Sequence, residues 1–498
     1  MSVEKLKQRQ SKIQEKRKTT SRRDFLMQIA SRRPLSFYKS NSFISRYPNN
    51  ERKPHIISHS LFDETRDSLV WVHIAQWNWF SEIFSNLMSK VELTPTQQMW
   101  NNENADYADM ILGGKNIYLS TISVYGCEDI LYSFATRENT KHVISSNMVF
   151  ENSEIIFNSK WIIRSSFIFY STFIIDSSQM WFCTNCIWCH DCIESDNLEN
   201  KAYCIKNKQY SREEYNTFKN KILSKKETFV QKFAQIPSQW KNVWSKNTTW
   251  SFVIHSENVS DWYFSYNINN SRNIMYMWWA GWNEDMYDVF VGWAIQWDNM
   301  YGVQWSGNSQ HIYSSMIIND SSHIYYSMYL LACSHCLWCI WLKNASYCIF
   351  NKQYTKDERY NEVEKIFAQM EKDWQLWEFF PWSMNPFYFN DTAAYLIDSS
   401  FTKEEVIAKW YLWRDEPIKV DIPVGSTRVS TADLDQYEWF DSDWIWTIDP
   451  DILKKIIIDT DGNSYRIIKM EYDFLVKHGL PLPRKHWLER MKDNFKIG

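Results

Sequence analysis

The sequence predicts a mainly β protein with helices, built on a duplicated parallel β-solenoid of about 12-residue coils that is capped by helices. Three observations predict this fold. An apolar pair returns every twelve residues, the repeat occurs in two copies, and each copy ends in a helix start signal. The 498 residues are 44% apolar and 23% charged, which is typical of globular domains rather than disordered chains.

The repeat is clearest in the middle of the chain. Apolar pairs stand at Ile156-Phe157 and Ile168-Phe169, and again at Ile312-Tyr313 and Ile324-Tyr325. Twelve residues are too few for a helical hairpin, so this period indicates stacked coils of two or three short strands with tight corners. We expect the pairs to point inward and to stack on the next coil. Similar pairs, spaced thirteen apart, stand upstream at Ile117-Tyr118, Ile130-Leu131 and Val143-Ile144.

The two runs are copies at a constant offset of 144 residues, as from Cys189 to Cys333. The segment Asn207-Lys208-Gln209-Tyr210 recurs at residues 351–354. A capping box follows each copy, Ser211 with Glu214 and Thr355 with Glu358, and predicts the start of a helix. Because the open end of a solenoid exposes unpaired strand edges, we expect each helix to cover that end.

The remaining elements follow in order. Phe80 to Val91 has the apolar spacing of an amphipathic helix, and Thr402 with Glu405 opens another. Ile456 to Ile468 predicts a strand pair turning at Asp461-Gly462, followed by a helix from Glu471 to His478 that Gly479 ends. The expected parts are a basic arm and degenerate N-terminal segment at 1–65, a helical segment at 66–100, the first solenoid at 101–210, a capping helix and linker at 211–245, the second solenoid at 246–354, a capping helix at 355–372, a loop-rich acidic segment with a short helix at 373–452, and a degenerate ribbon-like hairpin and helix at 453–498.

The chain is unusually rich in tryptophan and poor in glycine. The chain has 28 Trp and 11 Gly, and their total of 39 in 498 residues is an ordinary sum for the two together. Trp282, Trp297 and Trp305 stand in turn contexts, where glycine adopts positive φ without strain. We therefore expect that UGA codons read as glycine have been written as tryptophan, with a Trp-rich protein as the alternative.

The cysteines allow two interpretations. Cys183, Cys186, Cys189 and Cys192 have a spacing that invites a metal site, and the second copy offers Cys333, Cys336 and Cys339. The second copy, however, places Ser327 and Leu330 where Cys183 and Cys186 stand. We expect a buried structural ladder, because Cys192 and Cys204 are one coil apart. The same choice, polar ladder or metal strip, applies to His311, His323 and His335.

The segment from Cys336 to Glu358 resembles a cysteine-motif, zinc-ribbon-type protein family of patescibacteria, sometimes labelled as CaiB/BaiF relatives. Glu378-Phe379-Phe380-Pro381 and residues 408–415 also match, and the resemblance covers roughly residues 75–490. It implies glycine at Trp338, Trp341, Trp377 and Trp410, and a true tryptophan at Trp413. Twelve-residue coils do not support the CoA-transferase fold of the CaiB/BaiF label. The C-terminal zinc ribbon that the family carries would place its ligands at Ile458, Asp461, His486 and Glu489, which marks this copy as degenerate.

No nucleophile elbow, phosphate loop or metalloprotease motif is present, so the sequence favours a non-enzymatic scaffold or macromolecular-interaction protein without a cofactor. One alternative is a solenoid enzyme acting on a glycan polymer, with Asp285 and Asp288 as candidate acids. Without a secretory leader or a long apolar run, we expect a cytoplasmic protein that binds a protein partner and no membrane. The other alternative is nucleic-acid binding by the basic arm, unless the acidic segment 414–451 neutralises it; the arm's residues are Lys5, Lys7, Arg9, Lys12, Lys16, Arg17, Lys18, Arg22 and Arg23.

Overall fold

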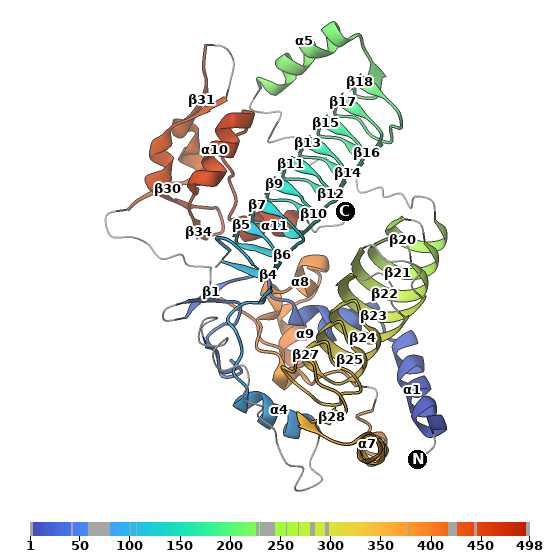
Figure 1. Cartoon of the computed structure of the whole chain (residues 1–498). Helices are drawn as coiled ribbons and strands as arrows, with labels where there is room; N and C mark the ends of the chain where they lie inside the picture. The colour runs from blue at the N-terminus through green and yellow to red at the C-terminus, as the bar shows by residue number, and fades with distance from the viewer. Residues whose placement is uncertain are drawn as a thin grey trace.

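A computed structural model shows two parallel β-solenoids joined by an N-terminal segment and flanked by helices and a small C-terminal unit (Figure 1). In the described part of the chain no helix is long and apolar enough to cross a membrane. The structure describes residues 3–40, 43–57, 80–99, 101–105, 107–225, 229, 245–254, 256–266, 268–278, 284–293, 298–376, 378–416, 426–442 and 446–494.

The first solenoid has two strands in each coil, and alternate strands form two parallel sheets. Ile156 pairs in register with Ile168 twelve residues on, and Ile117 with Ile130 thirteen residues on, as the sequence predicts. One sheet holds β3 (Gln98–Met99), β4 (Ala108–Leu112), β6 (Ser120–Val124), β8 (Phe134–Arg137), β10 (Asn147–Phe150), β12 (Lys160–Ile163), β14 (Thr172–Ile175) and β16 (Thr184–Ile187). The other holds β5 (Lys115–Tyr118), β7 (Glu128–Leu131), β9 (Lys141–Ile144), β11 (Glu154–Phe157), β13 (Ser166–Phe169), β15 (Ser178–Trp181), β17 (His190–Ile193), β18 (Ala202–Ile205) and β19 (Lys208–Gln209). The last of these strands, β19, is antiparallel to β18.

The second solenoid begins with longer strands and ends in short ones like those of the first. Its coils also stack in parallel, with Ile312 in register with Ile324. Each solenoid has its own buried interior, so the duplication predicted from the sequence is confirmed. The strands are β20 (Lys246–Ile254), β21 (Glu257–Tyr266), β22 (Asn269–Trp278), β23 (Glu284–Trp293), β24 (Asp298–Gly307), β25 (Gln310–Asn319), β26 (Ser322–Tyr325), β27 (Met328–Leu331), β28 (Cys348–Ile349) and β29 (Lys352–Gln353).

Serine side chains hold the corners of the coils from within. The Ser159 hydroxyl donates to the Phe157 carbonyl at 2.8 Å and accepts the N–H of Ser171, one coil on, at 3.0 Å. Ser171 repeats both bonds, to Phe169 and from Cys183. The corner N–H groups of Ser171 and Cys183 therefore have acceptors, which removes the cost of unpaired buried donors there.

The tight coils impose left-handed backbone on about every third residue, whatever its side chain. Ile155, Trp161 and Ile317 have φ of 60°, 56° and 57°. β-branched and bulky residues rarely adopt this conformation, which costs roughly 1–2 kcal/mol per residue. The ladder of hydrogen bonds between neighbouring coils holds the backbone there.

An asparagine ends each solenoid by imitating the next coil. The Asn351 side chain accepts the N–H of Ile340 at 2.9 Å and donates to the Ile340 carbonyl at 3.0 Å. In the first copy, the Asn207 side chain accepts the N–H of Asp196 at 2.8 Å. The helices α5 (Arg212–Leu223) and α7 (Lys356–Lys372) follow, and both predicted capping boxes are present in full.

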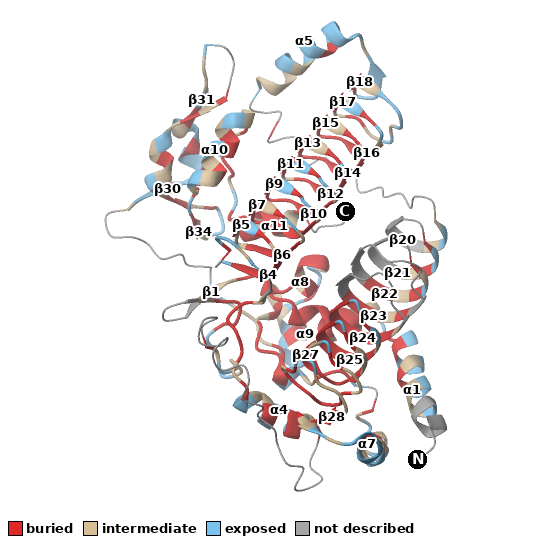
Figure 2. Cartoon of the chain, in the orientation of Figure 1, coloured by how far each residue is buried: buried red, intermediate tan, exposed pale blue. Residues whose placement is uncertain are grey.

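Only the first residue of each apolar pair points inward, which corrects the expectation for the second. Ile156 and Ile168 lie in the interior of the solenoid, whereas Phe157 and Phe169 lie in the core between the solenoid and its neighbours. The second residues form an aromatic column on the outside of each solenoid, because neighbouring strands place equivalent side chains about 5 Å apart. The rings of Tyr301 and Tyr313, for example, stack at 5.5 Å. Figure 2 shows β24 and β25, which carry these two rings, largely buried.

Each aromatic column is covered by a segment distant in sequence. On the first solenoid, Phe474 and His478 of α10 (Lys469–His478) contact Phe157 and Phe169 at ring distances of 6.0 and 5.9 Å. On the second, α1 (Val3–Lys18) lies against β23 and β24 (Figure 1). Its Gln14 donates to the Tyr313 hydroxyl at 3.3 Å.

The N-terminal segment joins the two solenoids through a buried charge cluster. Asp109 of the first solenoid accepts from Arg46 at 3.4 Å and forms an ion pair with Arg33 at 3.1 Å. Arg46 also donates to the hydroxyl of Tyr329 in β27 of the second solenoid. Arg33, Arg46 and Asp109 are all buried, so the cluster fixes one solenoid relative to the other.

The C-terminal unit begins earlier than the sequence suggests. The predicted turn and the end at Gly479 are observed, and β33 (Lys455–Ile458) pairs with β34 (Ser464–Tyr465). However, β30 (Thr427–Ser430) also pairs with β33, so the expected boundary at 452–453 runs through this sheet. The other elements are α2 (Arg22–Gln28), η1 (Ala30–Arg32), β1 (Tyr38–Ser40), β2 (Phe43–Ser45), α4 (Phe80–Lys90), η2 (Trp382–Met384), η3 (Phe389–Asp391), α8 (Ala393–Ile397), α9 (Lys403–Ala408), η4 (Thr431–Tyr437), β31 (Glu438–Phe440), β32 (Trp446–Ile448), η5 (Pro450–Lys454) and α11 (Trp487–Asp493).

Candidate functional site

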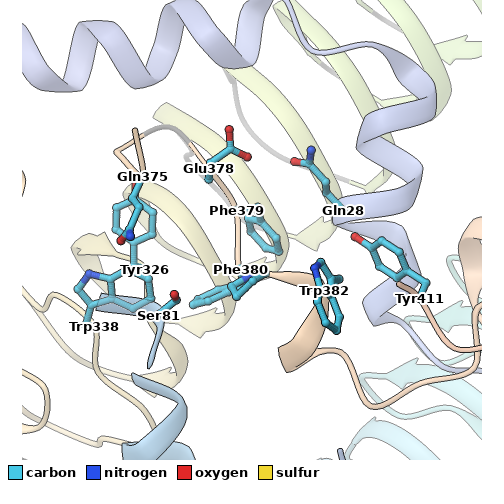
Figure 3. Close-up of a pocket in the computed structure, with 11 residues that line it drawn as sticks. Gln28, Ser81, Tyr326, Trp338, Gln375, Glu378, Phe379, Phe380, Trp382 and Tyr411 are labelled. Atoms are coloured by element: carbon cyan, nitrogen blue, oxygen red, sulfur yellow. The ribbon is translucent and has the colours of Figure 1, made fainter. Parts of the chain in front are cut away.

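A pocket of about 350 Å³ opens where α2, α4 and the segment 375–382 meet the end of the second solenoid (Figure 3). Its volume lies at the lower end of the range for ligand sites, which is roughly 300–1,000 Å³. Most of its lining is aromatic, with a few polar side chains. The lining residues are Gln28, Ser81, Tyr326, Trp338, Gln375, Glu378, Phe379, Phe380, Pro381, Trp382 and Tyr411.

The aromatic side chains of the pocket support one another from three elements. The rings of Phe379 and Phe380 meet edge to face at 5.0 Å, and the ring of Phe84 in α4 stacks behind Phe380 at 5.6 Å. Tyr326 stacks on Trp338 at 4.8 Å along the solenoid. These contacts fix the rings in place before any ligand arrives.

A buried arginine holds the backbone of the pocket wall. The Arg32 guanidinium donates to the Phe380 and Pro381 carbonyls at 2.6 and 2.8 Å, and to the carbonyl of Gln28 at 3.1 Å. Burial lowers the pKa of Arg32 to about 10, so the group stays charged at neutral pH. The wall is therefore tied to α2 by charge-assisted hydrogen bonds.

Several polar side chains that line the pocket have no hydrogen-bond partner among the described residues. The Glu378 carboxylate is exposed and has no hydrogen-bond or ion-pair partner among the described residues. The side-chain nitrogen of Gln375 is buried without a hydrogen-bond partner in the same part of the chain. Gln28, by contrast, accepts from Arg17 at 3.2 Å. The hydroxyls of Ser81 and Tyr411 also line the pocket, so it holds several polar groups beside largely buried rings.

The cysteines singled out in the sequence lie inside the solenoids. The Cys183 thiol takes the place of a ladder serine and donates to the Trp181 carbonyl at 3.3 Å, as Cys339 does to Leu337 at 3.4 Å. Cys192 and Cys204 pair in register, so the predicted ladder is observed. All ten cysteines are free and buried, including the metal candidates Cys186, Cys189, Cys333 and Cys336.

Neighbouring cysteines of the first solenoid share hydrogen bonds along the column. Hydrogen bonds with Cys183 and Cys189, together with burial, raise the pKa of Cys186. Hydrogen bonds shared with Cys186 and Cys192 lower the pKa of Cys189. In the described part of the chain, no group of three or more His, Cys, Asp or Glu side chains is placed to hold a metal ion.

The basic arm makes ion pairs within the chain. Arg9 pairs with Glu364 at 3.2 Å, and Lys12 pairs with Glu371, both on α7. Where the structure describes both sides, the carboxylates that meet Arg9 and Lys12 lie on α7 and not in the acidic segment 414–451, which corrects that expectation. Arg17 pairs with Asp288, Arg23 pairs with Glu405, and Lys18 lies over the Tyr287 ring. Lys16 is exposed and Arg22 is half-buried. The side chains of Lys5 and Lys7 lie outside the described residues.

Comparison with protein-family models, curated proteins and solved structures finds no match for this chain. Asp288, a candidate acid for glycan chemistry, is fully buried, accepts from Asn273 at 2.8 Å and pairs with Arg17. The side chain of Asp285 lies outside the described residues. Of the four expected ribbon positions, His486 is buried and its ring accepts the N–H of Leu488 at the start of α11.

The sequence points to only part of the pocket. Glu378-Phe379-Phe380-Pro381 stands out as a motif, but nothing in the sequence places it beside Tyr326 or Tyr411. The segment after α7 returns to the second solenoid, where the Tyr326 hydroxyl donates to the Leu376 carbonyl.

The histidine ladder is observed as predicted, and it gives a pH-dependent expectation. The His311, His323 and His335 rings lie 4.7 and 4.5 Å apart. The pKa of His323 is lowered from 6.5 to about 4. Burial is the largest cause, and the nearby charges of His335, His311 and Arg359 lower it further. The unfolded chain therefore takes up this proton first, so stability present above pH 6.5 is lost as the pH falls towards 4.

We expect His323→Asn to remove part of this loss, on the order of 1 kcal/mol after solvent screening. The measurement is the urea midpoint of both proteins at pH 7.5 and 4.5. His142→Asn is the matched control, because Asp129 raises the pKa of His142 and its contribution has the opposite sign. An equal acid-induced shift in His323→Asn and the parent chain would contradict the expectation.

Proposed function

We propose that this protein is a non-enzymatic scaffold whose solenoid flanks dock α-helical segments of protein partners. The observation that carries the proposal is that the same kind of surface, the outer column of each solenoid, is covered by a different segment in each copy. Equivalent aromatic columns on the two solenoids take two unrelated segments of the chain, α10 and α1. A surface that accepts two different helices is suited to accepting a third from another chain.

The contact of α1 is mostly polar, as in reversible interfaces. Among the described side chains of α1, Ile13 is apolar and buried, and Arg17 is buried in an ion pair with Asp288. Nearer the surface, Gln14, Arg9 and Lys12 bind through hydrogen bonds and ion pairs. Such a contact is weakened by salt, because ions screen partly exposed charges. A helix held in this way can exchange with a helix of similar charge.

We expect α1 to rebind in trans. A protease site placed between α1 and α2 is cleaved in the folded chain, and α1 is then released by raised salt and replaced by a labelled peptide of residues 1–18. Glu371→Lys is expected to weaken peptide binding by about tenfold, since it reverses the charge that Lys12 and Arg9 contact. Fluorescence anisotropy measures the affinity.

Glu362→Lys is the matched control, because Glu362 lies on the same helix but pairs with the exposed Lys365. Equal weakening by both variants, or a cleaved α1 that never exchanges, would argue against the proposal.

We also propose, for the lineage, that glycine stands at several positions written as tryptophan, as in the patescibacterial family that the chain resembles. Trp374 and Trp410 support this, because each occupies the left-handed position that ends a helix. Trp305, Trp338 and Trp341 also have positive φ, whereas Trp282, Trp297 and Trp377 lie outside the described residues. Coding DNA with UGA at these positions supports the proposal, and UGG overturns it. The ten free cysteines favour a reducing cytoplasm.

A further inference from the structure

We propose that the second solenoid selects the helices that dock on it by an arginine site, a buried group of residues that binds one guanidinium group of the docked helix. The site is formed by Asn273, Asp288 and Gly302, and Arg17 of α1 occupies it. This inference rests on the helix docking proposed above and names the kind of partner that the surface accepts, a helix with an arginine at one fixed place.

The arginine site lies in a corner column of the solenoid, beside the stacked tyrosines. Tyr287 is in register with Tyr301, so Asp288 and Gly302 stand at the same corner of neighbouring coils. On the other side of Asp288, the Asn273 amide donates to its carboxylate at 2.8 Å. The three corner residues have left-handed backbone, with φ of 52°, 58° and 67° in chain order. The coils therefore fix the carboxylate in place whether or not a helix is docked.

Arg17 reaches this site almost completely buried. Its side chain is 2% exposed and that of Asp288 is 0% exposed, and Nη1 of Arg17 lies 3.5 Å from the Asp288 carboxylate. The same nitrogen donates to the Gln28 side-chain oxygen at 3.2 Å, and the guanidinium carbon lies 5.8 Å from the centre of the Phe379 ring. Gly302 makes room for the guanidinium, because a Cβ there would stand 2.9 Å from Nε of Arg17.

The chemistry of the site favours arginine over other side chains. Burial raises the pKa of Asp288 to about 6, and the charge of Arg17 opposes this shift. At pH 7.5 the carboxylate is therefore ionised, and a buried carboxylate without a cation is costly. A guanidinium group can contact Asp288, Gln28 and Phe379 together because it is planar and has several donors, whereas the ammonium group of lysine is a single point of charge.

The tyrosine column sets the position of the arginine within a docked helix. Gln10 donates to the hydroxyl of Tyr325, and Gln14 donates to that of Tyr313 at 3.3 Å. These tyrosines are one coil apart, and one helical turn of roughly 5.4 Å spans a coil spacing of roughly 4.8 Å. Arg17 follows Gln14 by three residues on the same face of α1. The favoured partner is therefore a helix with polar donors at positions i and i+4 and an arginine at i+7.

The first solenoid does not offer the same site to the helices that cover it. Beside α10 and α11 its corner column holds Tyr132, Ser145 and Asn158, none of which is acidic. Arg490 of α11 donates there to the Ser145 hydroxyl at 2.8 Å, and its carboxylate partner, Glu471 at 2.8 Å, belongs to α10. Because the acid comes from the covering unit, this part of the first solenoid does not itself require an arginine, and the two surfaces select different helices.

Exchange of α1 in the full chain cleaved between α1 and α2, measured by fluorescence anisotropy, tests the proposal. We expect peptides of residues 1–18 with Arg17→Gln or Arg17→Lys to bind at least about tenfold more weakly than the unchanged peptide. Lys16→Gln is the matched control, because it removes one positive charge from an exposed position of the same helix, and it should bind within about twofold of the unchanged peptide. Only the peptide varies, so the fold of the chain is not affected.

A chain variant supplies the second arm. We expect Asp288→Asn to bind the unchanged peptide at least about tenfold more weakly, and Arg17→Gln to lose little further affinity there, since the two side chains form one contact. If the unchanged peptide binds no better than either Arg17 variant, or if Arg17→Gln weakens binding equally in both chains, the arginine site is overturned while helix docking stands. An unchanged peptide that never rebinds overturns both. The peptide comparison decides the matter even where Asp288→Asn fails to fold.

Discussion

Replacement of Asp109 by alanine is expected to lower the free energy of unfolding by about 3–5 kcal/mol. Asp109 is the carboxylate between Arg33 and Arg46, and all three side chains are buried. Its removal leaves two guanidinium groups without a carboxylate in the core, where an uncompensated charge is costly. Urea denaturation at pH 7.5 measures the loss.

The matched control is Asp176→Ala, because Asp176 binds Arg164 through two hydrogen bonds on the exposed flank of the same solenoid. Exposed ion pairs contribute about 0–1 kcal/mol, so the control should change little. We also expect Asp109→Ala to loosen the junction, since Arg46 links Asp109 to Tyr329 of the second solenoid. Similar losses in the two variants would contradict this account of the cluster.

The double replacement Trp374→Gly and Trp410→Gly is expected to raise the free energy of unfolding by about 1–2 kcal/mol. Both residues follow the end of a helix. Trp374 has φ of 60° and is 74% exposed, and Trp410 has φ of 63° and is 66% exposed. The N–H of Trp410 donates to Ile407, and the next N–H donates to Val406, which is the pattern that glycine favours. Gly479 ends α10 with the same two bonds and φ of 62°.

Trp413→Gly is the control for that experiment. Trp413 packs on Tyr395 at 5.2 Å, and the family resemblance implies a true tryptophan there. We expect this variant to lose about 2 kcal/mol, because it removes packed aromatic area. Thermal and urea unfolding of the three chains give the comparison, and destabilisation by the double replacement would argue against glycine at 374 and 410.

The coils were predictable because their information is local. Each coil contacts its neighbours, so a twelve-residue period sets the register, and a capping box needs only four residues, as at Ser211 and Thr355. The end of α10 at Gly479 was predictable for the same reason.

The covering of the coils and the pocket were not predictable, because they depend on surfaces far apart in sequence. Phe157 and Ile156 look alike in the repeat, yet only a neighbour such as Phe474 shows that Phe157 faces outward. The basic arm likewise finds its carboxylates on α7, whose charges look no different in sequence from those of 414–451. Glu378 and Tyr326 line the same pocket only because the helices are packed against the coils of the second solenoid.

The asparagine at the end of each solenoid makes the backbone hydrogen bonds that a further coil would make, so each solenoid can change its length only by whole coils. Asn351 can end the stack only after a whole turn, because its side chain must meet the backbone of Ile340 one coil earlier. Insertions or deletions of about one full coil before it would preserve the serine and isoleucine columns, whereas half a coil would move each strand into the opposite sheet. The 144 residues that separate equivalent positions of the two copies include α5 as well as coils, yet both copies end in the same asparagine-containing segment. Such a chain can lengthen or shorten in evolution by copying whole turns while its end structure stays the same.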